Sequence, residues 1–147
     1  MNRYELLCRY DLIRRELHLD QPVLVSGAAM VVHRLRKTCE VVDILVTRSE
    51  FYRLAQQYPV TSSTLHVRGY ISIPKLCVNI GITKAAWTYS KYPAPLQEGS
   101  LTMPAGYLTP RGLEAMKREM VERFNREQDR LDLALIRQTI TKEGRFR

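Results

Sequence analysis

The residues between Val23 and Thr47 have types and spacing that suit phosphate and metal chemistry. The pair Ser26-Gly27 interrupts a short β-branched run, and apolar residues then recur at helical spacing. Glycine at the start of a helix lets backbone N–H groups approach an anion, and the helix dipole favours a phosphate there. An acid on the following strand, Asp43, can hold a metal ion against that phosphate. The same residues also fit an ordinary strand–helix–strand core with one acid at the end of a strand.

The order of these features resembles the nucleotidyltransferase superfamily that includes polymerase beta, and most of all its small abortive-infection-type and antitoxin-like members. In that family a strand, a Gly-Ser or Gly-Gly turn and a helix precede an Arg-x-Thr-like segment, and Asp-x-Asp follows on the next strand. Here Ser26-Gly27 matches the turn, the segment from Arg36 to Thr38 matches the basic segment, and Asp43 matches the second acid. The resemblance implies that Ser26, Gly27 and Arg36 bind a nucleotide.

A second part of the resemblance lies near the end of the chain, from Leu108 to Leu133. This stretch is similar to the family's two closing helices, with Lys117 on the first, and Arg126, Asp129 and Asp132 in an Arg-x-x-Asp-x-x-Asp pattern on the second. The resemblance implies that Lys117 and Arg126 help to bind the nucleotide. Charged residues three or four apart on a helix also form ordinary surface pairs, which contribute only about 0.2–0.5 kcal/mol each.

The acids depart from the family pattern. Nucleotidyl transfer typically uses two divalent ions, and magnesium prefers oxygen ligands, so the family places two or three carboxylates on adjacent strands. If Asp43 is the second acid, the first position falls on Val41; if Glu40 is the first acid, the second position falls on Val42. On a regular strand Glu40 and Asp43 face opposite sides unless a bulge intervenes.

The third acid of the family is also missing. In the strand expected at residues 76–82, the candidates are Cys77 and Asn79, and neither is a carboxylate. The favoured interpretation is therefore that the standard two-metal chemistry is lost and the fold is kept. In the alternative, a bulge brings Glu40 beside Asp43, Asn79 is a neutral ligand, and magnesium is the cofactor of an active transferase.

The elements that must position these residues follow from hydrophobic periodicity and turn residues. The sequence predicts helix 3–18, strand 23–25, a short helix, strand 41–46, a helix with Ser49 as its N-cap that stops at Pro59, a β-rich region 60–90, a long connection 91–107, and two C-terminal helices after Thr109-Pro110 that are separated near Asn125. On these helices Leu113, Met116, Met120 and Phe124 mark a buried stripe, and Leu131 and Leu135 follow. This order predicts one α/β (α+β) domain over residues 1–147, a small mixed sheet flanked by helices and closed by two C-terminal helices, with a flexible basic tail at 141–147.

The composition agrees with one basic domain. The chain has 147 residues, 45% of them hydrophobic, with a net charge of +8 and a pI near 9.7. This charge attracts polyanions such as RNA, DNA or nucleotides, although scattered charges are also typical of a basic surface without a specific partner. The three cysteines form no Cys-x-x-Cys pair, so neither zinc nor a disulfide framework is indicated. No signal peptide or membrane-spanning run is present, and we expect a cytoplasmic protein.

Two functional hypotheses follow. In the first, the chain is an NTP-using nucleotidyltransferase or a catalytically degenerate nucleotide-binding relative, in which Asp43 with Glu40 holds the metal. In the second, it is a non-catalytic binding or inhibitor protein that holds a nucleic acid or a protein. The aromatic group Trp87, Tyr89 and Tyr92 can stack a base or pack a small satellite core. The resemblance also implies a toxin–antitoxin or phage-defence setting.

Overall fold

The computed structural model describes residues 1–62, 69–83 and 91–145, and in this part of the chain seven strands form one mixed sheet in the order β3-β4-β5-β2-β1-β7-β6. The strands are β1 (Val23–Leu24), β2 (Val42–Val46), β3 (Val60–Thr61), β4 (Tyr70–Ile73), β5 (Val78–Ile82), β6 (Lys91–Glu98) and β7 (Leu101–Leu108). The helices are α1 (Arg3–Glu16), α2 (Ser26–Val32), α3 (Arg48–Ala55), α5 (Pro110–Phe124) and α6 (Glu127–Arg145), and a 3-10 turn, η1, spans Pro74–Leu76. The predicted α/β class with two closing helices is confirmed.

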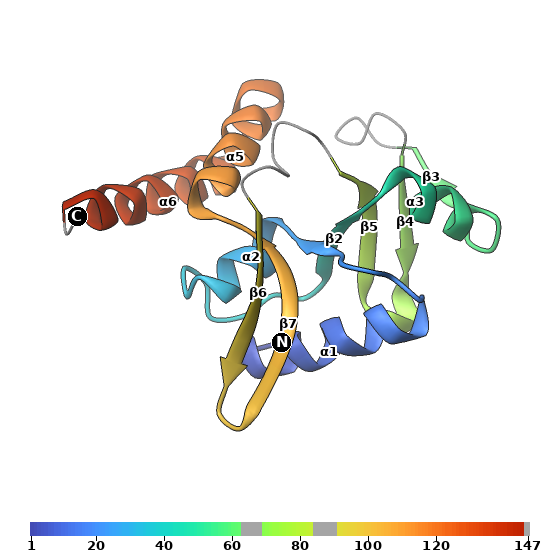
Figure 1. Ribbon diagram of the computed structural model, residues 1–147. Helices are drawn as coiled ribbons and strands as arrows, with labels where there is room; N and C mark the ends of the chain where they lie inside the picture. Colours follow the sequence, from blue (N-terminus) through green and yellow to red (C-terminus); the bar gives the residue numbers. More distant parts are fainter. Residues whose placement is uncertain (63–68, 84–90, 146–147) are drawn as a thin grey trace.

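Two groups of buried side chains form the core. One contains residues of α1 and α3, and the other contains residues of α5 and α6, while α2 contributes to both. Alternate residues of β2 divide between them, because Ile44 belongs to the first group and Leu45 to the second. Figure 1 shows α1 along the lower end of the sheet and the packed α5–α6 pair at the upper left.

The register of the central strands sets a row of polar side chains. β2 runs parallel to β5 and pairs Asp43 with Asn79, and β5 runs antiparallel to β4 and pairs Asn79 with Ser72. Since residues paired across a sheet share a face, these three side chains lie on the face that also carries Leu45. This is the face on which α5 packs.

The helices of the N-terminal half begin at capping boxes. Asn2 and Glu5 exchange backbone and side-chain hydrogen bonds at the start of α1, which confirms the predicted helix with an end two residues earlier. The N-cap of α3 is Thr47 and not Ser49, because the Thr47 hydroxyl accepts from the Glu50 N–H and the Glu50 carboxylate accepts from the Thr47 N–H. The sequence pattern Thr-x-x-Glu predicts this start.

The predicted long connection at 91–107 is wrong, since these residues form the antiparallel hairpin β6–β7. Pro93 and Pro95 favour a connection in the sequence, but β6 is the edge strand of the sheet, where a missing N–H removes no required hydrogen bond. Gly99, with φ of +60°, turns the chain between the two strands. Only the last part of the predicted strand around Gly69 is described, as β4, and Trp87 and Tyr89 lie outside the described residues, as does the side chain of Tyr92.

The first closing helix begins and ends as predicted. The Thr109 hydroxyl accepts from the Gly112 N–H at the start of α5, and Asn125 has the left-handed conformation that ends it. On α6 the buried apolar residues include Ile136, whereas Leu131 and Leu135 are exposed. The helix continues to Arg145, so the prediction of a flexible tail at 141–147 is wrong as far as that residue.

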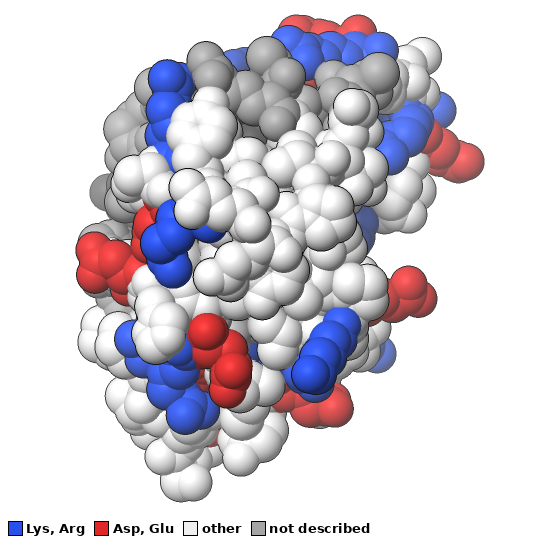
Figure 2. Space-filling model, turned by 90° about the vertical axis from the view of Figure 1, so that its right-hand side faces the viewer, with Lys and Arg blue, Asp and Glu red and all other residues white. Residues whose placement is uncertain are grey.

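The charges of one face are shown in Figure 2, which views the molecule from the side of α3, β3 and β4. Lysine and arginine side chains lie there in separate groups, with acids beside several of them, and the middle of this face carries no charged side chain. Among the described helices, none combines the length and apolarity needed to cross a bilayer.

Candidate functional site

A polar pocket of about 440 Å³ lies between the start of α2, the loop that follows α2 and the strand β2. Its described lining residues are Ser26, Gly27, Arg36, Thr38, Cys39, Glu40, Val41 and Asp43. Ligand pockets commonly measure roughly 300–1,000 Å³, so this volume suits a small molecule or part of one. Five of the residues expected from the sequence to bind a ligand therefore line one pocket.

The turn at Ser26-Gly27 forms one wall of this pocket. The Val25 N–H donates to the Asp43 carbonyl over 3.0 Å, which places the turn next to the acid-bearing strand. Ser26 has a φ of +53°, a left-handed conformation that costs a non-glycine residue about 1–2 kcal/mol. Gly27 is buried, and a Cβ there would lie 2.9 Å from Nη1 of Arg36, so the guanidinium group covers this glycine closely.

Asp43, on β2, is a half-buried residue of the pocket lining. Burial raises the pKa of its carboxyl from 3.8 to about 6, although a hydrogen bond with Asn79 and the charges of Lys117 and Arg36 act in the opposite direction. The parallel register explains the Asn79 contact, because the two residues are directly paired. Asp43 is thus a desolvated carboxyl that carries its charge near neutral pH at a free-energy cost.

Glu40 reaches the same pocket although it lies three residues before Asp43. It precedes the first residue of β2, Val42, so the alternation of a strand does not apply to it. The structure therefore brings Glu40 and Asp43 to one pocket without a bulge within β2. Glu40 is exposed at the rim.

The oxygen donors of this pocket suit one hard divalent cation. Asp43 and Glu40 offer carboxylate oxygens, which magnesium accepts while it keeps several waters. Within residues 1–62, 69–83 and 91–145, no three His, Cys, Asp or Glu side chains are grouped to hold a metal ion. Two carboxylates in the described lining are fewer than the carboxylate set of a two-ion site requires.

A buried ionic cluster on α5 and α6 lies behind the pocket. Nζ of Lys117 is 3.2 Å from Oδ1 of Asp129 and 3.0 Å from Oδ2 of Asp132. All three residues are at most 3% exposed. The sequence offered ordinary surface pairs as one explanation for these acids, and their burial contradicts it.

Arg36 connects this cluster to the pocket. Its Nη2 donates to Oδ2 of Asp132 over 2.6 Å, and Gln128 donates to the other oxygen of the same carboxylate over 2.8 Å. Burial raises the pKa of Asp132, but the hydrogen bonds from Arg36, Gln128 and Lys117 together hold it below its ordinary value. Asp132 is therefore an ionised, fully bonded group.

The remaining predicted residues lie outside the pocket lining. Lys117 is buried between two carboxylates, so its ammonium group is already paired. Arg126 is largely exposed; it pairs with Asp129 and lies over the ring of Phe124. His33 bonds through Nε2 to the Leu108 carbonyl over 2.7 Å and stays outside the pocket lining as well.

Sequence reasoning did not predict that Asp129 and Asp132 are buried. A usable indication was present, because Asp129, Asp132 and Ile136 recur at intervals of three and four residues, as do the members of one helical stripe. Acids on the buried stripe of a helix require a cation nearby, and Lys117 on the preceding helix supplies it.

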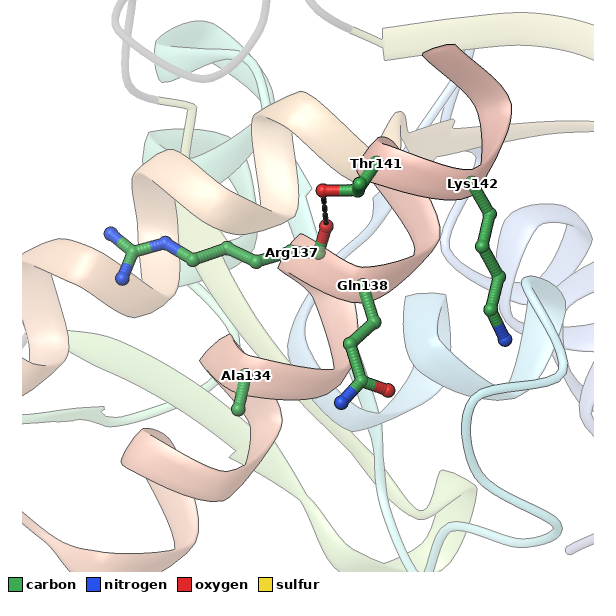
Figure 3. A pocket seen from close by; sticks show the side chains of 5 residues that line it. All are labelled: Ala134, Arg137, Gln138, Thr141 and Lys142. Atoms are coloured by element: carbon green, nitrogen blue, oxygen red, sulfur yellow. Dashed lines mark hydrogen bonds between the residues drawn. The ribbon is translucent and has the colours of Figure 1, made fainter. Parts of the chain in front are cut away.

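A second hollow lies on α6, and Figure 3 shows its described lining: Ala134, Arg137, Gln138, Thr141 and Lys142. All five residues come from one helix, and the long side chains of Arg137 and Lys142 point in different directions. The one hydrogen bond drawn there is from the Thr141 hydroxyl to the Arg137 carbonyl, over 2.9 Å. No acid or strained backbone belongs to this lining, and the pocket at Asp43 is the better candidate site.

Comparisons with protein-family models, with curated proteins and with solved structures find no match to this chain. The structure defines it as an α/β protein with a seven-stranded mixed sheet over its described residues and two C-terminal helices packed together. Any function must be argued from the pocket itself.

Proposed function

We propose that the chain is a nucleotidyltransferase-like domain that binds a nucleoside triphosphate with one magnesium ion and has lost the standard two-metal catalysis. The observation that carries the proposal is the meeting of Asp43 and Glu40 with the Ser26-Gly27 turn and Arg36 in one pocket. A pocket in which a desolvated carboxylate lies beside groups that suit a metal and a phosphate is typical of a ligand-binding site. The strand–turn–helix–strand order of the nucleotidyltransferase resemblance supports it.

Each residue has a role in this proposal. The backbone of Ser26-Gly27 and the guanidinium group of Arg36 bind the phosphates, because N–H donors and a planar cation match phosphate oxygens. Asp43 holds the metal, Glu40 completes its ligands from the rim, and Asn79 orients the Asp43 carboxylate. Magnesium supplies positive charge that neutralises phosphate oxygens. Lys117 and Arg126 act from behind the pocket by neutralising the acids of α6.

Loss of two-metal chemistry is proposed because neutral residues occupy the other acid positions. Asn79 lies directly beside Asp43 on β5. If Asp43 is the second acid of Asp-x-Asp, the first position is Val41, and if Glu40 is the first acid, the second position is Val42. An amide oxygen is a weaker ligand for a hard cation than a carboxylate. A second magnesium ion would therefore lack the anionic ligands that offset its dehydration.

The test is isothermal titration of the four NTPs, with and without magnesium, on the wild type and on Asp43→Ala. We expect magnesium-dependent binding that disappears in Asp43→Ala. The control is Asp20→Asn, since Asp20 is an exposed acid away from the pocket lining. Binding that is absent, or indifferent to magnesium and to Asp43, contradicts the proposal.

A second candidate function is a non-catalytic protein that binds a nucleic acid or another protein. The net charge of +8 and the incomplete acids favour it. The described residues of the face in Figure 2 form no continuous basic stripe of the kind that a nucleic-acid backbone requires. Capture of RNA or DNA with a steep salt dependence, by a protein that binds no NTP, would support this function instead.

A further inference from the structure

We infer that Asp132 is a positioning residue, which holds Arg36 against the Gly27 turn so that the guanidinium group meets the phosphate chain of the ligand. This inference rests on the proposed nucleotide binding, and it names the part of the ligand that Arg36 recognises. It also assigns a role to the buried acids of α6, which do not line the pocket.

The first step is the orientation of Arg36. One end of its guanidinium group, Nη2, donates to Asp132, and the other amino nitrogen, Nη1, lies 2.9 Å from the Cβ position of Gly27. Among the described residues, Nη2 is the one nitrogen of this side chain with a hydrogen-bond partner. Nη1 and Nε therefore remain to donate to a ligand in the pocket, and a phosphate oxygen is the acceptor that best matches this fork.

The second step is the rigidity of the support. Asp132 is 1% exposed and accepts from Gln128 and Lys117 in addition to Arg36. Lys117 is fixed in turn by Asp129. Because three donors hold the Asp132 carboxylate, its position is fixed. Arg36 therefore adopts the orientation in which its guanidinium group bonds to Asp132.

The third step is the gain from this fixation. Arg36 lies between the end of α2 and the start of β2, outside any regular element, and its side chain is 30% exposed. Ordering such a side chain on binding costs free energy that prior fixation removes. Loss of the Asp132 carboxylate should therefore weaken binding of the phosphate chain by about 10-fold.

Gly27 provides the space that the guanidinium group of Arg36 occupies. A Cβ at this position would come within 2.9 Å of Nη1, at the far end of a flexible side chain. Gly27→Ala should therefore displace the guanidinium group and leave the backbone in place, since Gly27 has no left-handed φ. It perturbs the position of Arg36 without touching the buried cluster.

The experiment is a double-mutant cycle on the full chain, with the Kd of ATP and of inorganic tripolyphosphate measured in magnesium. Asp132→Asn should raise both Kd values about 10-fold in the wild-type background and should have no effect in the Arg36→Gln background. Asp129→Asn is a graded comparison, because Asp129 is equally buried on α6 but reaches Asp132 only through Lys117, so it should raise both Kd values less than Asp132→Asn does. The control is Asp20→Asn, at an exposed acid outside the pocket lining, which should leave both Kd values unchanged.

The outcomes separate this inference from the function on which it rests. Failure of the wild type to bind ATP and tripolyphosphate overturns both. Normal wild-type binding with an additive effect of Asp132→Asn in the Arg36→Gln background means a general structural role, and overturns the inference alone. If Asp132→Asn does not fold, Gly27→Ala decides: it must weaken binding about 10-fold at an unchanged Tm, and again only when Arg36 is present.

Discussion

Asp43→Asn is expected to stabilise the folded protein at neutral pH, although it removes the proposed metal ligand. Burial raises the pKa of Asp43 from 3.8 to about 6, a difference of about two units. Each unit corresponds to about 1.4 kcal/mol, so the ionised carboxylate lowers the free energy of unfolding by about 3 kcal/mol. Asparagine has the same shape without the charge, and its oxygen can still accept a hydrogen bond from the amide of Asn79.

The pH dependence gives the sign of the effect. Because the pKa is higher in the folded than in the unfolded state, the folded protein binds the proton more tightly, and the penalty is present in full above about pH 6. As the pH falls from about 6 to about 4, Asp43 becomes neutral in the fold and the penalty disappears. The advantage of Asp43→Asn should therefore shrink from about 3 kcal/mol at pH 7.5 to nearly zero near pH 4.

The assay is urea unfolding of the wild type, Asp43→Asn and Asp20→Asn across this pH range. Asp20→Asn removes the same charge from an exposed position, so its difference from the wild type should stay within about 0.5 kcal/mol. A destabilised Asp43→Asn protein at pH 7.5, or a gain that does not change with pH, would refute the argument from desolvation. The contacts of Asp43 would then stabilise its charge more than burial disfavours it.

Two further predictions concern buried polar groups. Lys117→Met should lower the free energy of unfolding by about 3–5 kcal/mol, because Asp129 and Asp132 lose their shared cation. Lys142→Met, on the exposed side of α6, is the control and should be nearly neutral. Equal urea midpoints for the two variants would contradict this prediction. Tyr10→Phe should lower the free energy of unfolding by about 1–3 kcal/mol, because the Tyr10 hydroxyl donates to the Pro22 carbonyl and accepts from the Gly106 N–H in two buried hydrogen bonds. Thermal unfolding measures the effect, with Tyr4→Phe at an exposed position as the control. Equal Tm values for the two variants would count against these bonds.

Local sequence patterns predicted the elements whose ends are set by neighbouring residues. The Thr109-Pro110 start and the Asn125 end of α5 depend on caps within one turn, and the structure has both. The hairpin β6–β7 was missed because its prolines are acceptable only at a sheet edge, and the position of β6 at the edge is a property of the whole sheet. Strand order is set by long-range pairing, which no local pattern contains.

The candidate site likewise has parts that depend on neighbouring residues and parts that depend on long-range packing. The Ser26-Gly27 turn and Asp43 lie within one stretch of sequence, and the structure places them in one pocket. Strand alternation places Glu40 opposite Asp43 unless a bulge intervenes, but β2 begins at Val42, so the alternation does not extend back to Glu40. The bond from Arg36 to Asp132 joins residues 96 positions apart, so it depends on how α6 packs and could not be read from spacing.

Two costs in free energy coincide at this pocket. Ser26 holds a left-handed backbone, and Asp43 keeps a desolvated carboxylate. A scaffold that used only its outer surface would gain stability from replacing each of them. Their grouping around one volume is what a preorganised ligand site requires, since strain and desolvation there are offset only when the ligand binds. The cost of the unliganded pocket therefore favours nucleotide binding over a function confined to the basic surface.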